Sequence, residues 1–111
     1  MGKRGFLGGF ELLVLLALIR LDAEAYGVPI AQAIEESSGR DVALGSVYIT
    51  LGRLGRKGLV SSRLGESTAE RGGRAKTYFR ITAKGLREVR QARQTFINLW
   101  HGVPQLQRGV V

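Results

Sequence analysis

Four polar side chains recur on one side of a predicted helix near the middle of the chain. At 100° per residue, the segment from residue 44 onward places them on the stripe opposite an apolar stripe, so they should point outward. Two hydroxyls and two cations, with no acid, are groups that hydrogen-bond base edges and phosphates. This pattern predicts a nucleic-acid contact, although an ordinary hydrated helix face is the simpler alternative. The polar stripe comprises Ser46, Thr50, Arg53 and Lys57, and the apolar stripe Val47, Leu51 and Leu54.

Tyr48 lies about 60° beyond the apolar stripe of the same helix. Its hydroxyl could reach a phosphate, or its ring could complete the core, and the spacing leaves both interpretations open. We therefore keep Tyr48 among the candidate DNA contacts.

A β-hairpin is predicted after this helix. Gly58 can adopt the positive φ that ends a helix, and residues 60–66 and 75–82 are strand-like runs. In the second run Thr77, Phe79 and Ile81 should face the core, whereas Lys76, Tyr78 and Arg80 should face outward. Between the runs, Arg71 and Arg74 flank two glycines, so we expect a flexible wing tip that contacts DNA. Lys76 is a further candidate, or a hydrated strand residue.

The preceding segments predict two helices. Residues 10–21 are apolar around nearly the whole circumference, which indicates burial both in the domain and against a second subunit. Residues 27–38 begin with a proline in the first turn and end before Gly39, a typical C-terminal cap. The central helix could begin at Ala43 or Ser46.

A final helix is predicted from about residue 83 to 101, with Thr82 as its N-cap. Its apolar stripe has nothing after it in sequence to cover it, so we expect it to pack on a partner chain. The predicted dimer interface, which could also hold a ligand, comprises Leu13, Leu16, Phe96, Leu99 and Trp100.

Length and charge set limits on the class of protein. The 111 residues carry a net charge of +8 and no cysteine, which excludes disulfides and thiolate metal sites. Residues 1–40 carry four cations and five anions, and residues 41–111 thirteen and four, so the excess positive charge lies in the second part. The apolar run 12–19 is too short to span a membrane, and charges around it oppose a secretory signal. A basic patch on a cytoplasmic domain fits a nucleic-acid partner.

The central helix and the turn after it contain Gly45, Tyr48, Lys57 and Gly58, and Lys76, Thr82 and Gly85 follow. This combination resembles the PadR family of bacterial transcriptional regulators, in the subgroup with a single C-terminal helix. The Tyr26–Gly27 pair and the leucine-rich first helix match as well, over about residues 8–103. Ile49 departs from the family, which often has proline there, as do Gly52 and Gly55, where it has longer side chains. The matching residues are Gly45, Ser46, Val47, Tyr48, Thr50, Leu51, Arg53, Leu54, Lys57, Gly58, Leu59, Arg74, Lys76, Tyr78, Thr82 and Gly85.

The resemblance implies a mainly α protein with a small β-ribbon: a winged helix-turn-helix over residues 1–82 and a dimerisation helix over 83–103. Residues 104–111 are expected to be a disordered tail. It further implies a homodimer that binds a roughly palindromic double-stranded operator and represses transcription. Relatives that sense lipophilic or aromatic compounds imply a ligand near Phe96 and Trp100, with plain dimer packing as the alternative.

Enzymatic functions have little support in the sequence. We find no phosphate-binding loop, no nucleophile elbow and no spaced set of histidines and acids. We therefore expect that the protein is not an enzyme and that it binds neither a metal nor a cofactor. The alternative function is a winged-helix module that binds a protein through the same basic face.

Overall fold

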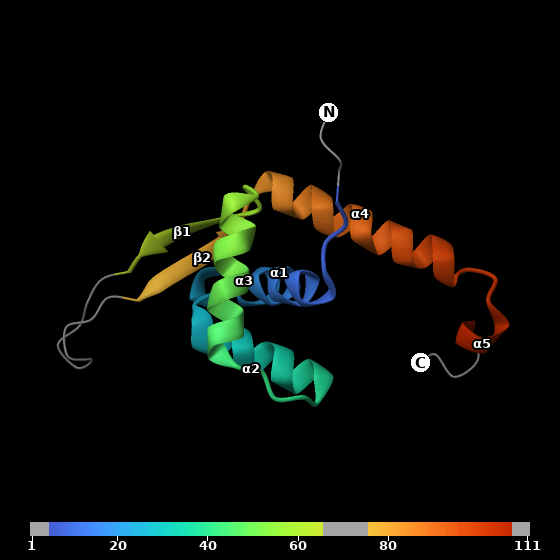
Figure 1. Cartoon of the computed structure of the whole chain (residues 1–111), viewed down its shortest axis with the longest axis horizontal. Helices are drawn as coiled ribbons and strands as arrows, with labels where there is room; N and C mark the ends of the chain where they lie inside the picture. Colours follow the sequence, from blue (N-terminus) through green and yellow to red (C-terminus); the bar gives the residue numbers. More distant parts are fainter. Residues whose placement is uncertain (1–4, 66–75, 108–111) are drawn as a thin grey trace.

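Three helices and a two-stranded sheet form the body of the molecule, and a long fourth helix projects from it (Figure 1). The computed structural model describes residues 5–65 and 76–107. The elements are α1 (Gly9–Leu21), η1 (Asp22–Glu24), α2 (Gly27–Ser38), α3 (Leu44–Arg56), β1 (Val60–Leu64), β2 (Thr77–Ile81), α4 (Ala83–Trp100) and α5 (Pro104–Gln107).

The turn between α2 and α3 is fixed at both ends by hydrogen bonds to Glu35. Gly39 ends α2 with a φ of 72°, as predicted, and its N–H donates to the Glu35 carbonyl at 2.8 Å. The Glu35 carboxylate in turn accepts from the Val42 N–H at 2.8 Å. Helix α3 then begins after Ala43, which is the earlier of its two predicted starts. These bonds set the direction in which α3 leaves α2.

The predicted β-hairpin is present, with shorter strands than expected. β1 and β2 pair antiparallel in a register that places Val60 opposite Ile81 and Leu64 opposite Thr77. The N–H of Phe79 donates to the Ala25 carbonyl at 2.8 Å, so β2 is held to the segment before α2. The loop that was predicted to form the wing tip lies outside the described residues.

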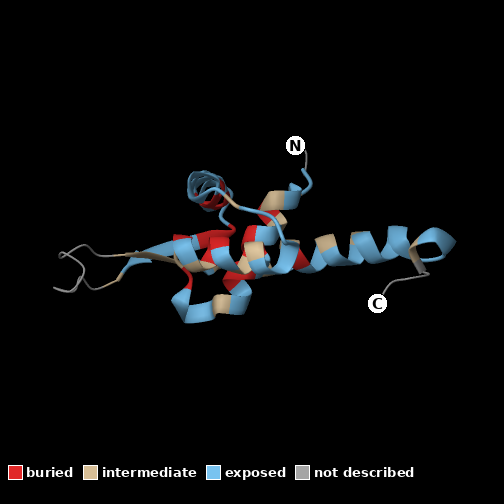
Figure 2. Cartoon of the chain, turned by 90° about the horizontal axis from the view of Figure 1, so that it is seen from below, coloured by how far each residue is buried: buried red, intermediate tan, exposed pale blue. Residues whose placement is uncertain are grey.

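The hydrophobic core lies where α1, α2, α3 and the sheet meet. Its largest fully buried side chains are Leu15, Ile30, Leu51, Leu54, Val14 and Val47. Buried residues are concentrated in this body, whereas the outer part of α4 is exposed (Figure 2). The radius of gyration is 16.2 Å, against about 13 Å for a compact chain of this length. The projecting helix α4 contributes to the difference (Figure 1).

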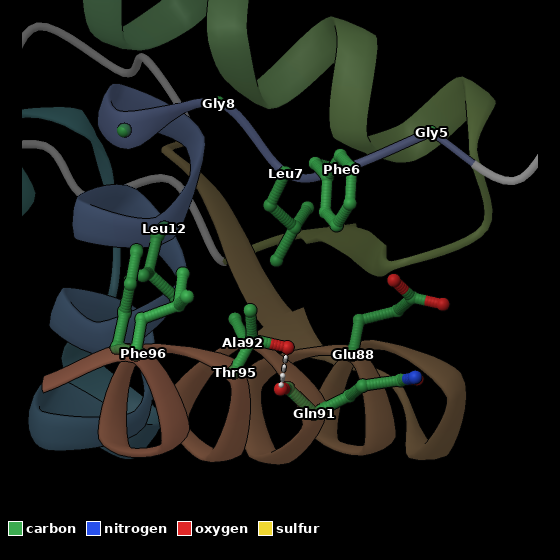
Figure 3. Close-up of a pocket in the computed structure, with 12 residues that line it drawn as sticks. Gly5, Phe6, Leu7, Gly8, Leu12, Glu88, Gln91, Ala92, Thr95 and Phe96 are labelled. Carbon is green, nitrogen blue, oxygen red and sulfur yellow. Dashed lines mark hydrogen bonds between the residues drawn. The ribbon is translucent and has the colours of Figure 1, made fainter. Parts of the chain in front are cut away.

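Helix α4 is anchored at its N-terminal end by a side-chain cap. Thr82 caps it as predicted, because its hydroxyl accepts from the Gly85 N–H at 3.0 Å and donates to the Gly58 carbonyl at 2.7 Å. Val89 is buried, but the side chains of residues 96–100 are exposed. The segment 5–8, which leads into α1, crosses over the middle of this helix (Figure 3).

The prediction of a disordered tail from residue 104 is wrong for its first part. Residues 104–107 form the short helix α5, and the Trp100 indole N–H donates to the Leu106 carbonyl at 3.4 Å. Gly102, with a φ of 77°, provides the turn between α4 and α5. Residues 108–111 lie outside the described residues.

Candidate nucleic-acid interface

The face of α3 that points away from the body is defined by the side chains that it buries. Val47, Leu51 and Leu54 are buried as predicted, with at most 1% of their surface exposed. At 100° per residue, the direction opposite to this stripe is occupied by one line of residues. All four are exposed, and they make up the outward line of α3: Gly45, Ile49, Gly52 and Arg56.

The predicted polar stripe lies on one flank of α3 rather than on its outward line. Ser46 and Arg53 are exposed there, so both are available to a ligand. The placement of Thr50 on an exposed face is wrong, because only 4% of its surface is accessible. Since α3 packs against both α1 and α2, its buried arc is wider than its apolar stripe and includes Thr50. Thr50 therefore offers no free surface to DNA in this structure.

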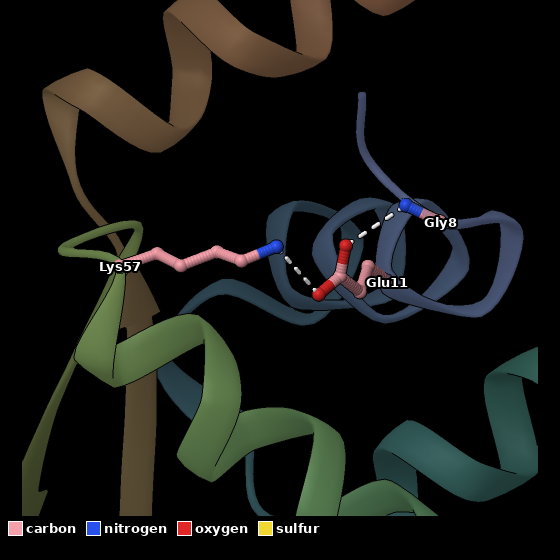
Figure 4. A network of polar contacts seen from close by, with 3 residues as sticks. All are labelled: Gly8, Glu11 and Lys57. Atoms are coloured by element: carbon pink, nitrogen blue, oxygen red, sulfur yellow. Dashed lines mark hydrogen bonds and ion pairs between the residues drawn. The ribbon is translucent and has the colours of Figure 1, made fainter. Parts of the chain in front are cut away.

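Lys57 is bound within the protein instead of pointing freely into solvent. Its ammonium donates to Glu11 Oε2 at 2.9 Å, and Glu11 Oε1 accepts from the Gly8 N–H at 2.8 Å (Figure 4). Burial opposes ionisation of Glu11, but the Gly8 N–H, Lys57 and the nearby charge of Arg53 lower the pKa of its carboxyl below the ordinary value. The Lys57 side chain remains 44% exposed. We therefore assign it first to holding α3 against α1.

Tyr48 packs on the beginning of α2. A Cβ atom placed on Gly27 would overlap the hydroxyl and ring of Tyr48, so these two residues are in close contact. Tyr48 nevertheless keeps 45% of its surface accessible. It thus combines the two roles that the sequence left open, a packing ring and an accessible edge.

Two cations and two aromatic rings form a cluster where the sheet meets the start of α2. The ammonium of Lys76 lies 4.0 Å from the centre of the Tyr26 ring, and the Arg63 guanidinium 4.8 Å from that of Tyr78. The two rings meet edge to face at 5.4 Å. These cation–π contacts hold the side chains of Arg63 and Lys76 against the aromatic rings of Tyr78 and Tyr26. Arg71 and Arg74 lie outside the described residues.

The segments that form α3, the sheet and the start of α4 carry charges of one sign. Residues 44–65 and 76–84, which supply α3, both strands and the start of α4, contain no aspartate or glutamate. A surface with these properties attracts a polyanion. The cations in these segments are Arg53, Arg56, Lys57, Arg63, Lys76, Arg80 and Lys84.

A second feature is the apolar surface along α1 and the outer part of α4. Leu13 and Leu16 keep 40% and 46% of their surface exposed, and Leu99 keeps 73%. Between the N-terminal segment and α4 lies a cavity of about 420 Å³, where Leu12 and Phe96 stand side by side (Figure 3). Its apolar lining includes Phe96 and Leu99 but not Trp100, Leu13 or Leu16.

Neither a membrane span nor a metal cluster is found in the ranges 5–65 and 76–107. No helix there is both long enough and apolar enough to cross a bilayer. No group of three or more His, Cys, Asp or Glu side chains there could hold a metal ion.

The order of elements and the basic face together define a winged helix-turn-helix protein. The model of the transcriptional regulator PadR-like family matches residues 15–91. The chain therefore belongs to this family, as its sequence indicated, and it is a DNA-binding transcriptional regulator. A search of curated proteins found no significant match.

Solved structures of PadR-like regulators share the fold over most of the chain. A Bacillus cereus regulator is 25% identical with a TM-score of 0.70, covering 91% of this chain and 93% of its own. An Eggerthella lenta regulator is 26% identical with a TM-score of 0.67, covering 88% and 83%. A Clostridium difficile regulator is 25% identical with a TM-score of 0.65, covering 86% and 100%.

Sequence reasoning missed the outward line of α3. Arg56 and Ile49 were not among the candidate contacts, although both project directly away from the body. The sequence did contain a signal for this line. On a helical wheel, the position directly opposite the average of Val47, Leu51 and Leu54 is occupied by Ile49 and Arg56, and Ser46 lies to one side of it. Ile49 carries no hydrogen-bonding group on its side chain, so a pattern of polar residues does not include it.

Proposed function

We propose that the protein is a cytoplasmic homodimeric repressor that inserts α3 of each subunit into the major groove of a roughly palindromic operator. The observation that carries the proposal is the exposed outward line of α3, which has the exposed Arg53 beside it on the same helix and contains no acid. A helix with small residues on its outer side can approach the floor of the groove, while neighbouring cations neutralise phosphates.

Dimerisation is supported by apolar surface that residues 5–65 and 76–107 leave uncovered. Leu13 and Leu16 on α1, and Phe96, Leu99 and Trp100 on α4, are all at least 40% exposed. Exposed apolar side chains in this number on adjoining helices are costly unless a partner buries them. A two-fold arrangement of α1 and α4 would place two copies of α3 on one side of the dimer.

A small lipophilic or aromatic ligand is the proposed inducer. The cavity of about 420 Å³ is lined largely by apolar groups, including Leu12, Phe96 and Leu99, and pockets for small molecules are typically about 300–1,000 Å³. A ligand there would shift the N-terminal segment or α4, and hence the spacing of the two α3 helices. Trp100, the one tryptophan, gives an emission signal for titration.

The decisive experiment selects binding sites from random duplexes and measures affinity for the selected operator at several salt concentrations. Arg53→Ala and Arg56→Ala should each weaken binding and reduce the slope of log K against log salt by about 0.9 for each phosphate that is no longer neutralised. Arg90→Ala on the exposed side of α4 is the matched control and should leave the slope unchanged.

Sedimentation at micromolar concentration tests the dimer directly. Leu99→Glu should produce a monomer that binds the operator far more weakly. A monomeric wild-type protein would contradict the dimer, and the absence of any sequence preference at low salt would instead favour the protein-binding module. A panel of lipophilic aromatics that changes neither Trp100 emission nor operator affinity would contradict the inducer.

A further inference from the structure

Ile49 is exposed on the surface that the proposed function assigns to DNA. It keeps 64% of its surface accessible, more than any other large apolar residue of α3. It lies on the outward line of the helix, opposite Val47 and Leu54, so its side chain contributes nothing to the core. An isoleucine at such a position is not explained by folding, because exposing it to water gives no stability.

Ile49 lies between two glycines on the outward line of α3. Gly45 precedes it by one turn and Gly52 follows it by about one turn. A Cβ atom on Gly45 would meet no atom within 4 Å, and one on Gly52 would meet only the Arg56 guanidinium at 3.7 Å. The fold therefore has room for side chains at both glycines. Ile49 is therefore the one apolar side chain on the outward line, between two positions that carry no side chain.

The chemistry of base edges selects one partner for such a side chain. In the major groove, adenine, guanine and cytosine present hydrogen-bonding atoms, and thymine alone also presents a methyl group. An isoleucine cannot hydrogen-bond, so it would leave a polar edge dehydrated without a partner. Packed on the C5 methyl of thymine, it buries apolar surface on both sides.

We infer that Ile49 is a specificity-determining residue that reads a thymine C5 methyl group in each half of the operator. The inference rests on the proposed function, because it needs α3 to lie in the major groove. Arg56 lies one turn beyond Gly52 on the outward line, and Arg53 lies on the neighbouring flank of α3. These two cations supply the phosphate contacts that hold Ile49 in register.

The test replaces thymine by uracil, which removes only the methyl group, at each thymine of the selected operator in turn. With the wild-type protein, uracil at one position per half-site should lower affinity about fourfold, which corresponds to about 0.8 kcal/mol for one buried methyl group. Ile49→Ala should abolish this uracil penalty, whereas Ile49→Val should keep most of it. Val28→Ala truncates an apolar side chain of α2 that is 43% exposed, and it should leave the penalty unchanged.

Two failures can be told apart. If the wild-type protein selects no sequence, the proposed function fails and the assignment of Ile49 falls with it. If the protein selects an operator but no uracil lowers affinity, or if Ile49→Ala retains the full penalty, only the assignment of Ile49 is overturned. A penalty that also disappears in Val28→Ala would overturn it too.

Discussion

The ammonium of Lys57, directly after α3, donates a 2.9 Å hydrogen bond to the buried carboxylate of Glu11 in the first turn of α1 (Figure 4). The two residues are 46 positions apart in the chain. The bond fixes the C-terminal end of the helix proposed to enter DNA to the helix proposed to form the dimer. A movement of α1 is thereby coupled to the position of α3.

Breaking this link should lower stability in a pH-dependent way. Glu11→Gln and Lys57→Met should each reduce the free energy of unfolding at neutral pH by about 1 kcal/mol, a modest value because Lys57 is half-exposed. The pKa of Glu11 is lowered in the folded state. Its stabilisation is therefore full above the ordinary glutamate pKa of 4.5 and disappears as pH falls through the lower folded value.

Urea unfolding at a series of pH values measures this effect. The difference between wild type and Glu11→Gln should shrink as the solution is acidified. Arg90→Met, which removes an exposed cation of α4, is the control and should change stability little. A difference that stays constant from neutral to acidic pH would show that the ionised pair does not cause it.

Gly52→Ala should separate stability from DNA binding. A Cβ atom there makes only ordinary contact with Arg56, and alanine favours a helix by up to about 1 kcal/mol over glycine. The thermal midpoint should rise, whereas operator affinity should fall because the methyl group holds the helix away from the base edges. An increase in both the thermal midpoint and the operator affinity would show that the surface at Gly52 does not contact DNA.

Gly27→Ala should destabilise the domain by about 1–3 kcal/mol through overpacking. The added methyl group would overlap Tyr48, which lies against the start of α2. Tyr48→Ala should remove the clash, so the double variant should be less destabilised than the sum of the single changes. Chemical denaturation of the four proteins gives the coupling energy, and strict additivity would place the strain elsewhere.

Thr82→Ala should cost about 0.5–2 kcal/mol, as the removal of an N-cap does. The hydroxyl both accepts from Gly85 and donates to the Gly58 carbonyl, so it joins α4 to the turn after α3. Thr95→Ala is the matched control, because the Thr95 hydroxyl donates only to the Gln91 carbonyl within α4. Equal decreases of unfolding free energy in the two variants would argue against a special role for Thr82.

The local patterns of the sequence were sufficient to predict most of the elements. The proline in the first turn of α2, Gly39 at its end and Thr82 before α4 are signals that act within a few residues, so they do not depend on the rest of the fold. The period-two pattern of Phe79 and Ile81 likewise predicted the core side of β2. Among the described residues the strands are Val60–Leu64 and Thr77–Ile81, so Gly65, Lys76 and Thr82 fall outside them, and Thr82 caps α4 instead.

The sequence by itself determined which residues share a helix face, the excess of positive charge after residue 41, and membership of the family. Only the tertiary structure decided how each face is oriented. Helical periodicity fixes the angles between residues of one helix, but the packing of α1 and α2 around α3 sets which arc is covered. That packing buried Thr50, engaged Lys57 and left Ile49 and Arg56 outermost. The same reason holds for α4, whose apolar stripe is buried at Val89 but mostly exposed at Leu99, because the described part of the chain covers its outer turns only partly.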